Sequence, residues 1–295
     1  MDMRTRGEKI FAVFNYFLMT LIAFLTLYPM WHILMSSISD PTEVLLHRGA
    51  YFWPRGTPQI RGFILVFQNP NITTGYMNTL FYVVIGTILS MFSTILGAYV
   101  LSRKGLYWNR IVMKLIVFTM FFQGGIMPFY IQVMNMGLLD NRWSIILPVM
   151  VATMNLIILR TAFASAPDSL VESAKLDGAS EWLIVWRIIV PISKAAVAVI
   201  VLFYAVGYWN AWFNASIFLN DRTLWPIQLV LREILIQGDT TAMVDMGTVG
   251  QAGIERYRML VRYTTIVVAT VPILLIYPFV QKYFVSGVMI GSLKE

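Results

Sequence analysis

Long runs of apolar residues, separated by shorter polar stretches, dominate the chain. Six runs reach the roughly 20 residues that a helix needs to cross the hydrocarbon core of a bilayer. They predict membrane-spanning helices over residues 10–35, 76–101, 111–134, 143–163, 195–219 and 263–284. The third run is the weakest, because Gly124, Gly125 and Pro128 interrupt it. The pattern therefore predicts an all-α integral membrane protein, organised as one membrane domain over residues 1–295.

Composition supports a lipid-facing surface. Of the 295 residues, 58% are hydrophobic and only 13% are charged, whereas a soluble domain has about 25% charged residues. The net charge of +7 is explained by Lys and Arg retained beside membrane segments, so we expect no nucleic-acid partner. The absence of cysteine excludes disulfides, thiolate metal sites and a cysteine nucleophile.

An even number of spans places both termini on the same side of the membrane. Arg4, Arg6 and Lys9 precede the first run, which is too long for a cleaved signal peptide. With the N-terminus in the cytoplasm, the cytoplasmic segments hold more than half of the 22 basic residues, as the positive-inside rule requires. A group of arginines over 256–262 weakens this bias, because it lies at the outer end of the sixth run.

The chain lacks the residues of a catalytic or ATP-binding site. It has no Gly-x-x-x-x-Gly-Lys-Ser/Thr phosphate loop, so we do not expect it to hold its own ATP. Its two histidines, His32 and His47, lie in or beside the long outer connection 36–75 and are better explained as interfacial residues than as ligands. We therefore expect no enzyme activity, no catalytic residue, no metal and no cofactor in this chain.

The interiors of the predicted spans contain almost no Asp, Glu, Lys or Arg. Carriers driven by protons or sodium usually place ionisable groups near the midplane, so energy should reach this protein from another subunit. Two alternatives stay open from the residues alone. Transport that survives ATP depletion would indicate a self-sufficient carrier or channel, and unchanged uptake in a deletion strain would indicate a non-transporting assembly protein.

The polar segment 164–191, between the fourth and fifth runs, carries the clearest functional signal. Ser165 and Asp168 have the spacing of a helix capping box, which predicts a short helix that ends at about Leu176. Gly178 can adopt the left-handed conformation that terminates such a helix. The segment is therefore predicted to fold as a bent pair of short helices outside the bilayer.

A second short helix should begin at Ser180 and run toward Pro191. Between the two helices lies a group of small residues with two carboxylates, which lets another protein approach closely and donate hydrogen bonds. The group consists of Glu172, Ser173, Ala174, Asp177, Gly178 and Ala179. On physical grounds alone, an ordinary cytoplasmic loop explains the same pattern.

These residues resemble a known motif. The sequence Glu172-Ser-Ala-x-x-Asp177-Gly178-Ala179, followed by Ile188-x-x-Pro191, is similar to the EAA motif of binding-protein-dependent ABC importer permeases. The usual form of that motif is E-A-A-x-x-x-G, and Ser173 replaces one small residue with another. The motif also lies where the family has it, between the fourth and fifth of six spans.

Other stretches resemble the carbohydrate branch of this family. The segments 207–213 and 281–294 are similar to MalG-type permeases. The segments 123–130 and 137–143 resemble a subgroup that handles complex, often uronate-containing polysaccharides. The resemblance covers nearly the whole chain, and it implies the MalG-type importer fold and an oligosaccharide substrate.

The resemblance also implies partners. The six-residue group would form a coupling helix that docks on an ATPase subunit, and the tail 287–294 would reach into the ATPase dimer. Two ATPase subunits would bind ATP and Mg²⁺, a homologous second permease would complete the pathway, and the outer loop 247–253 would contact an extracytoplasmic solute-binding protein. The location implied is the bacterial inner membrane, with both termini in the cytoplasm.

The fifth run contains a candidate substrate path. Aromatic rings can stack on the C–H faces of sugars and Asn amides can bond hydroxyls, and Tyr204 and Tyr208 share a helix face at a spacing of four. The candidates are Tyr204, Tyr208, Trp209, Asn210, Trp212 and Asn214. The alternative is an aromatic belt at the membrane interface with an asparagine that bonds a neighbouring helix.

Overall fold

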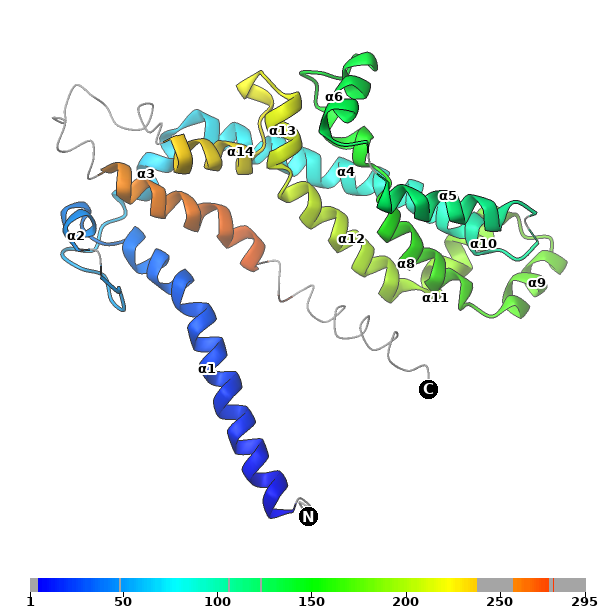
Figure 1. Ribbon diagram of the computed structural model, residues 1–295, viewed down its shortest axis with the longest axis horizontal. Coiled ribbons are helices and arrows are strands. Elements are labelled where there is room, and N and C mark those ends of the chain that lie inside the picture. The colour runs from blue at the N-terminus through cyan, green and yellow to red at the C-terminus, as the bar shows by residue number, and fades with distance from the viewer. Residues whose placement is uncertain are drawn as a thin grey trace. The chain divides into compact units, whose positions relative to one another are not determined.

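The computed structural model (Figure 1) describes residues 5–47, 49–105, 107–122, 124–237, 257–275 and 278. Within these residues it contains helices, turns and loops and no strand, so the all-α prediction is confirmed. The chain forms two compact units, Met1–Pro70 with Glu233–Pro272 and Asn71–Arg232 with Ile273–Glu295. The expectation of one permease domain over residues 1–295 stays a prediction.

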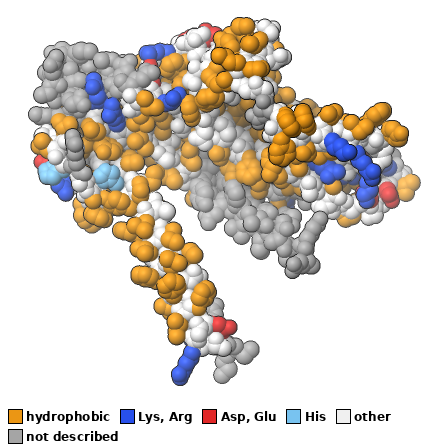
Figure 2. Space-filling model, viewed as in Figure 1, with side chains coloured by type: hydrophobic (Ala, Val, Ile, Leu, Met, Phe, Trp, Pro, Cys, Tyr) orange, Lys and Arg blue, Asp and Glu red, His pale blue; other side chains and the backbone are white. Residues whose placement is uncertain are grey.

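The first unit contains two long apolar helices and short helices beside them. These are α1 (Arg6–Ser37), α2 (Pro41–Leu46), α3 (Arg61–Gln68), a π-helical turn (Glu233–Gln237) and most of the helix Tyr257–Leu275, as far as Pro272. Thr5 and Glu8 form a capping box at the start of α1, and most apolar side chains along this helix are exposed (Figure 2). The helix α3 packs against Tyr257–Leu275 through Gly62, where a Cβ atom would come within 2.5 Å of the Thr264 hydroxyl.

The second unit is built on one unbroken helix and several shorter ones. The elements are α4 (Pro70–Ser102), α5 (Asn109–Phe121), α6 (Ile126–Asn135), α7 (Trp143–Ile146), a 3-10 turn (Leu147–Val149), α8 (Thr153–Ala164), α9 (Asp168–Leu176), α10 (Glu181–Ile184), a π-helical turn (Val185–Ile189), α11 (Val190–Ile192), α12 (Lys194–Trp209), α13 (Trp212–Phe218), a 3-10 turn (Arg222–Leu224) and α14 (Ile227–Arg232).

Three described helices are each long and apolar enough to cross a membrane, namely α1, α4 and Tyr257–Leu275. Three bent pairs of shorter helices bring the number up to six if each pair counts as one span. The predicted spans over 10–35 and 76–101 coincide with α1 and α4. The sixth span begins earlier than predicted, at Tyr257, and of its predicted remainder over 276–284 only Pro278 lies among the described residues.

The other three spans are broken. The interruption predicted in the third is confirmed, because α5 ends at Phe121 and α6 begins after Gly125, whose φ is +83°. The fourth span bends by 51° between Val149 and Thr153, just after Pro148, which has no N–H to donate. The fifth bends by 90° between Ile192 and Lys194, and its predicted range, 195–219, divides again between α12, which ends at Trp209, and α13, which begins at Trp212. At this second break the Val206 carbonyl accepts from both the N–H and the side-chain Nδ2 of Asn210, over 3.1 Å and 3.0 Å.

Close contact between α4 and α12 forms the core of the second unit. Tyr204 and Tyr208 on α12 are buried, and their hydroxyls bond Thr94 over 2.7 Å and Ser90 over 2.9 Å on α4. Gly86, four residues before Ser90, lies under the Tyr208 ring, where a Cβ atom would come within 2.7 Å of it. The contacting residues of both helices thus recur every four positions, which places them on one face of each helix.

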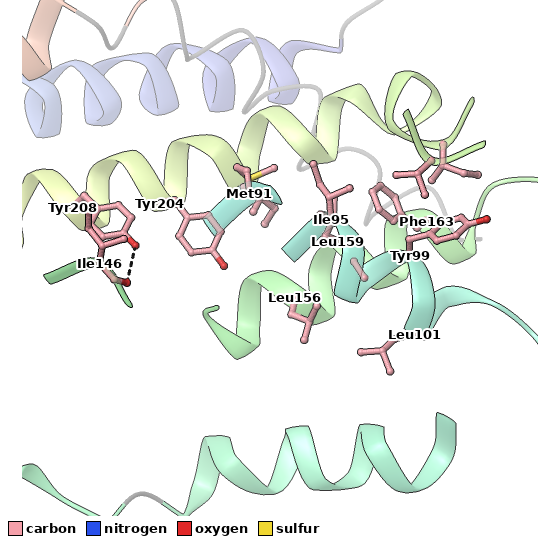
Figure 3. Packing of buried hydrophobic residues seen from close by; sticks show 14 of the residues in the cluster. Met91, Ile95, Tyr99, Leu101, Ile146, Leu156, Leu159, Phe163, Tyr204 and Tyr208 are labelled. Carbon is pink, nitrogen blue, oxygen red and sulfur yellow. Dashed lines mark hydrogen bonds between the residues drawn. The ribbon is translucent and has the colours of Figure 1, made fainter. Parts of the chain in front are cut away.

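The same hydroxyls reach the break in the fourth span. The Ala152 N–H donates to the Tyr204 hydroxyl over 3.0 Å, and Ala152 is the residue that precedes α8. The Tyr208 hydroxyl donates to the Ile146 carbonyl over 3.4 Å, drawn as a dashed line in Figure 3. Backbone groups freed by a broken membrane helix must find a partner inside the protein, and α12 supplies it.

Gly86 gives a test of this packing. We expect Gly86→Val to destabilise the protein by about 1–3 kcal/mol, the usual cost of overpacking a core, because the new side chain would displace the Tyr208 ring. Gly207→Val is the matched control, since a Cβ atom at Gly207 meets nothing within 4 Å. Thermal unfolding of the purified proteins in detergent measures the difference, and equal midpoints for the two variants would contradict the packing.

Candidate functional site

The first helix of the segment 164–191 is α9, which ends at Leu176 as predicted. The predicted capping box is wrong, because the residue before the helix is Pro167 and no side chain caps it. Ser165 instead caps the end of α8, where its hydroxyl donates to the Ala162 carbonyl over 2.7 Å. Pro167 has its φ angle fixed near the helical value, so α9 begins after it although no side chain accepts a hydrogen bond from the first turn.

Gly178 ends α9 in the left-handed conformation, with φ of +77°, as predicted. The Gly178 N–H donates to the Lys175 carbonyl over 3.1 Å, and the Ala179 N–H donates to the Ala174 carbonyl over 2.9 Å. This pair of bonds is the Schellman arrangement, which satisfies carbonyls at a helix end. The turn between the two short helices is therefore fixed by its own backbone.

The second short helix also forms where predicted. The Ser180 hydroxyl accepts from the Leu183 N–H over 3.3 Å and caps α10. Helical structure then continues through the π-helical turn to Ile192, and the chain bends by 90° before α12 begins at Lys194. The bent helix pair thus ends at a sharp corner that leads directly into the fifth span.

Most of the predicted coupling residues lie on the surface. Glu172, Ser173, Asp177 and Gly178 are exposed, and Ala174 and Ala179 are half-buried against the core of the unit. One residue that the sequence did not single out is Leu176, whose side chain is 89% exposed. Leu176 is the last residue of α9 and lies next to these small residues in the sequence.

Two charged contacts tie this segment to the end of α4. Lys104 Nζ lies 2.7 Å from Asp168 Oδ2, and the Tyr99 hydroxyl donates a short hydrogen bond to Glu181. Glu181 is in turn 2.6 Å from Lys175 Nζ, so it joins α9, α10 and α4. A cleft of about 670 Å³ lies between these contacts, and Glu172 forms part of its wall.

The pKa values of these carboxyl groups reflect the contacts. The hydrogen bond from Lys104 lowers the pKa of Asp168 below its usual value, and the same bond raises the pKa of Lys104. Hydrogen bonds from Lys175 and then Tyr99 lower the pKa of Glu181. Both carboxyl groups are therefore ionised at neutral pH, and the contacts persist over the physiological range.

The candidate path residues of the fifth span separate into two groups. Tyr204, Tyr208 and Trp209 are buried within the second unit, and the two tyrosines are hydrogen-bonded as described. Asn210 is exposed at the break between α12 and α13, while Trp212 and Asn214 are half-buried. The Arg232 guanidinium lies 4.1 Å from the centre of the Trp212 ring, a cation–π contact.

Three further predictions concern residues outside the described part of the chain. They are the polysaccharide-type residue Gln123, the loop 247–253 and the tail 287–294. Among the described residues, no group of three or more His, Cys, Asp and Glu side chains could hold a metal ion. His32 accepts from the Tyr51 N–H over 3.2 Å and thereby holds the loop that follows α1.

Residues 76–290 match a family model described as "Binding-protein-dependent transport system inner membrane component". The chain belongs to this family. The match covers the five spans that follow α1 and the EAA-like segment, so the resemblance proposed from the sequence is confirmed. The protein is accordingly a permease subunit of a binding-protein-dependent ABC importer, integral to the inner membrane, and neither alternative drawn from the residues alone is needed.

Individual relatives point to carbohydrates. "Polygalacturonan/rhamnogalacturonan transport system permease protein YtcP" of Bacillus subtilis (strain 168) is 38% identical over 97% of this chain and 99% of its own length. "Protein LplC" of the same organism is 37% identical over 98% of this chain and 97% of its own length. The fold also matches a solved bacterial ABC transporter involved in the import of the acidic polysaccharide alginate, with a TM-score of 0.87, 31% identity and coverage of 96% of this chain and 100% of that one.

Gly178 gives a test of the surface described above. We expect Gly178→Val to cost about 1–2 kcal/mol of backbone strain, because a left-handed valine is disfavoured, and to reduce co-purification of the ATPase subunits without loss of membrane insertion. A Cβ atom at Gly178 meets nothing within 4 Å, so the effect would arise from the turn and not from a clash.

Gly137→Val is the matched control for this variant. Gly137 ends α6 with φ of +67° and the same Schellman bonds, and a Cβ atom there also meets nothing within 4 Å. The control strains a similar turn outside the segment 164–191. Normal ATPase co-purification with Gly178→Val, or an equal loss with Gly137→Val, would contradict a docking role for this segment.

Proposed function

We propose that the exposed face of α9 and its glycine turn docks on a separate ATPase subunit. The observation that carries this proposal is the combination of an EAA-like motif with an exposed, self-stabilised turn. Glu172 and Asp177 offer carboxylates to donors on the partner, while the small residues permit close approach and Leu176 offers an apolar anchor. A preformed turn loses little conformational entropy when it docks.

The remaining subunits follow from this assignment. We propose that two ATPase subunits bind ATP and Mg²⁺, that a homologous second permease supplies the other half of the pathway, and that an extracytoplasmic binding protein delivers substrate. The end of the second unit that carries α9 and α10 would then face the cytoplasm, as would both chain termini. Lys and Arg side chains gather at that end in Figure 2, which agrees with the positive-inside rule.

The substrate we propose is an acidic oligosaccharide. Support comes from the two carbohydrate systems named above, one for polygalacturonan and rhamnogalacturonan and one for alginate. The pairing of Arg232 with Trp212 suits such a ligand, since an indole offers a face to a sugar ring and a guanidinium attracts a carboxylate. Arg232 ends α14, on the side of the second unit opposite to the coupling segment (Figure 1).

Within the fifth span, we propose a division of roles. Asn210, Trp212 and Asn214 contact the passing sugar, because the helix break exposes polar groups in an otherwise apolar span. The other three candidates lie behind these residues, complete the wall of the path and hold α12 in place; they are Tyr204, Tyr208 and Trp209. The hydroxyls of Tyr204 and Tyr208 already have partners inside the unit, which favours a supporting position.

The substrate class can be tested with the assembled transporter. We expect binding protein loaded with uronate oligosaccharides to stimulate ATP hydrolysis, with a weaker effect of neutral oligosaccharides and none of amino acids. The chain purified alone should show no ATP turnover above background. Stimulation by amino acids alone would reject the sugar assignment, and turnover by the isolated chain would reject the division of labour between subunits.

Asn210 and Tyr208 provide a contrast within one helix. We expect Asn210→Ala to lower oligosaccharide uptake by about tenfold, the effect of losing one polar contact of ordinary strength, with assembly and thermal stability unchanged. Tyr208→Phe removes a buried hydroxyl that bonds Ser90. This variant should mainly lower the thermal stability of the protein and have a smaller effect on oligosaccharide uptake. Unchanged uptake with Asn210→Ala would show that Asn210 does not contact the sugar and serves only to bond the Val206 carbonyl at the end of α12.

A further inference from the structure

The helix α4 is the only span of the second unit, within its described residues, that runs without a break. Its 33 residues extend over about 50 Å at 1.5 Å per residue. The third, fourth and fifth spans are interrupted, so movement at one end of them can be absorbed at the break. Among the described helices of this unit, α4 alone can carry a displacement from one end to the other as a rigid body.

At one end, α4 is attached to the segment 164–191 by directional contacts. The Tyr99 hydroxyl donates to Glu181, and Lys104, just beyond the helix, pairs with Asp168. Arg103 adds a hydrogen bond from its Nη2 to the Phe163 carbonyl over 3.1 Å. The two contacts with the segment lie on either side of the cleft, so α9 and α10 are each attached to the helix.

At the other end, α4 is attached to the chain that follows α13. Asn78 Nδ2 donates to the Thr223 and Trp225 carbonyls over 2.6 Å and 3.1 Å. The Tyr82 hydroxyl donates to the Leu224 carbonyl over 2.7 Å, and the Ile227 N–H donates to the Thr79 hydroxyl over 2.8 Å. Four hydrogen bonds from two turns of α4 therefore hold residues 223–227.

We propose that α4 moves as a rigid helix and transmits the movement of the segment 164–191 to the loop 219–227. The positioning residues, which attach the segment to this helix, are Tyr99, Lys104, Asp168 and Glu181. The inference rests on the proposed function, which places an ATPase at the first end and the proposed substrate contact of Trp212 and Arg232 toward the second. Loss of these contacts leaves the ATPase attached and active but disconnects its cycle from the outer loop.

The pairs orient the segment more than they stabilise it. Lys104 and Asp168 have side chains that are 85% and 49% exposed, and exposed ion pairs contribute little to folding free energy. The Tyr99 ring belongs to the buried core, and Tyr99→Phe keeps that ring while it removes the hydroxyl. Loss of both contacts should therefore spare the fold. This separation makes the proposal testable by coupling measurements and not by stability alone.

The test uses the double variant Tyr99→Phe/Lys104→Gln in the assembled transporter. We expect ATPase co-purification and basal ATP hydrolysis within about twofold of the unmodified protein, and sugar transported per ATP hydrolysed to fall by about fivefold or more, in the range of ordinary coupling energies. Arg110→Gln is the control, because it removes a nearby exposed cation outside the two contacts. The exchange Lys104→Asp/Asp168→Lys should retain most of the coupling.

A cysteine reporter measures the movement itself. The chain contains no cysteine, so Asn220→Cys creates a single reactive site on the exposed loop. We expect its labelling by a membrane-impermeant maleimide to change between the nucleotide-free and the ATP–vanadate states, and the Tyr99→Phe/Lys104→Gln background to abolish that change.

Three results would overturn the proposal. Full transport per ATP together with a normal labelling change in the double variant would show that the contacts do not engage α4. Loss of ATPase co-purification in that variant would show that they only shape the docking surface. Absence of ATPase association in the unmodified protein would instead contradict the proposed function, and the inference would fail with it.

Discussion

A peptide group in the hydrocarbon core has no water to bond, so a helix break survives there only if the protein supplies the missing partner. The fourth span breaks just after Pro148, and α12 supplies two phenolic hydroxyls there: that of Tyr204 accepts from the Ala152 N–H, and that of Tyr208 donates to the Ile146 carbonyl. Thr94 and Ser90 on α4 bond the same two hydroxyls. The need to satisfy the backbone at the break therefore joins the second, fourth and fifth spans.

This tie constrains the composition of α4. A tyrosine hydroxyl reaches Ser90 only if the ring lies against the α4 backbone, and the ring does so because Gly86 has no side chain. Small residues at helix contacts are a general feature of membrane proteins, since lipid offers no hydrophobic drive for association. Gly86, Ser90 and Thr94 on α4 therefore have a structural role in this contact.

The fold class and the segment 164–191 could be predicted because each depends on local sequence. Six apolar runs are sufficient for an all-α membrane protein, and Gly178 with Ser180 is sufficient for the bent helix pair. The breaks at Pro148 and Asn210 were missed, because an apolar run does not reveal where a partner hydroxyl makes a break tolerable. The burial of Tyr204 and Tyr208 was missed for a related reason: a face shared by two aromatic residues does not show what packs against it.

Two strengths of attachment coexist in the second unit. The contacts among α4, α12 and the fourth span are buried, where a hydrogen bond is strong and its loss leaves an unsatisfied group. The contacts that attach the segment 164–191 to α4 are different: one is the exposed ion pair between Lys104 and Asp168, and the other is a hydrogen bond from Tyr99 to Glu181. Salt screens the exposed pair, which can rearrange at small cost. A subunit that changes shape during transport needs both, since the spans must stay assembled while the segment 164–191, where we propose that the ATPase docks, shifts. The contacts with this segment can therefore set the direction of that shift without contributing much to the stability of either state.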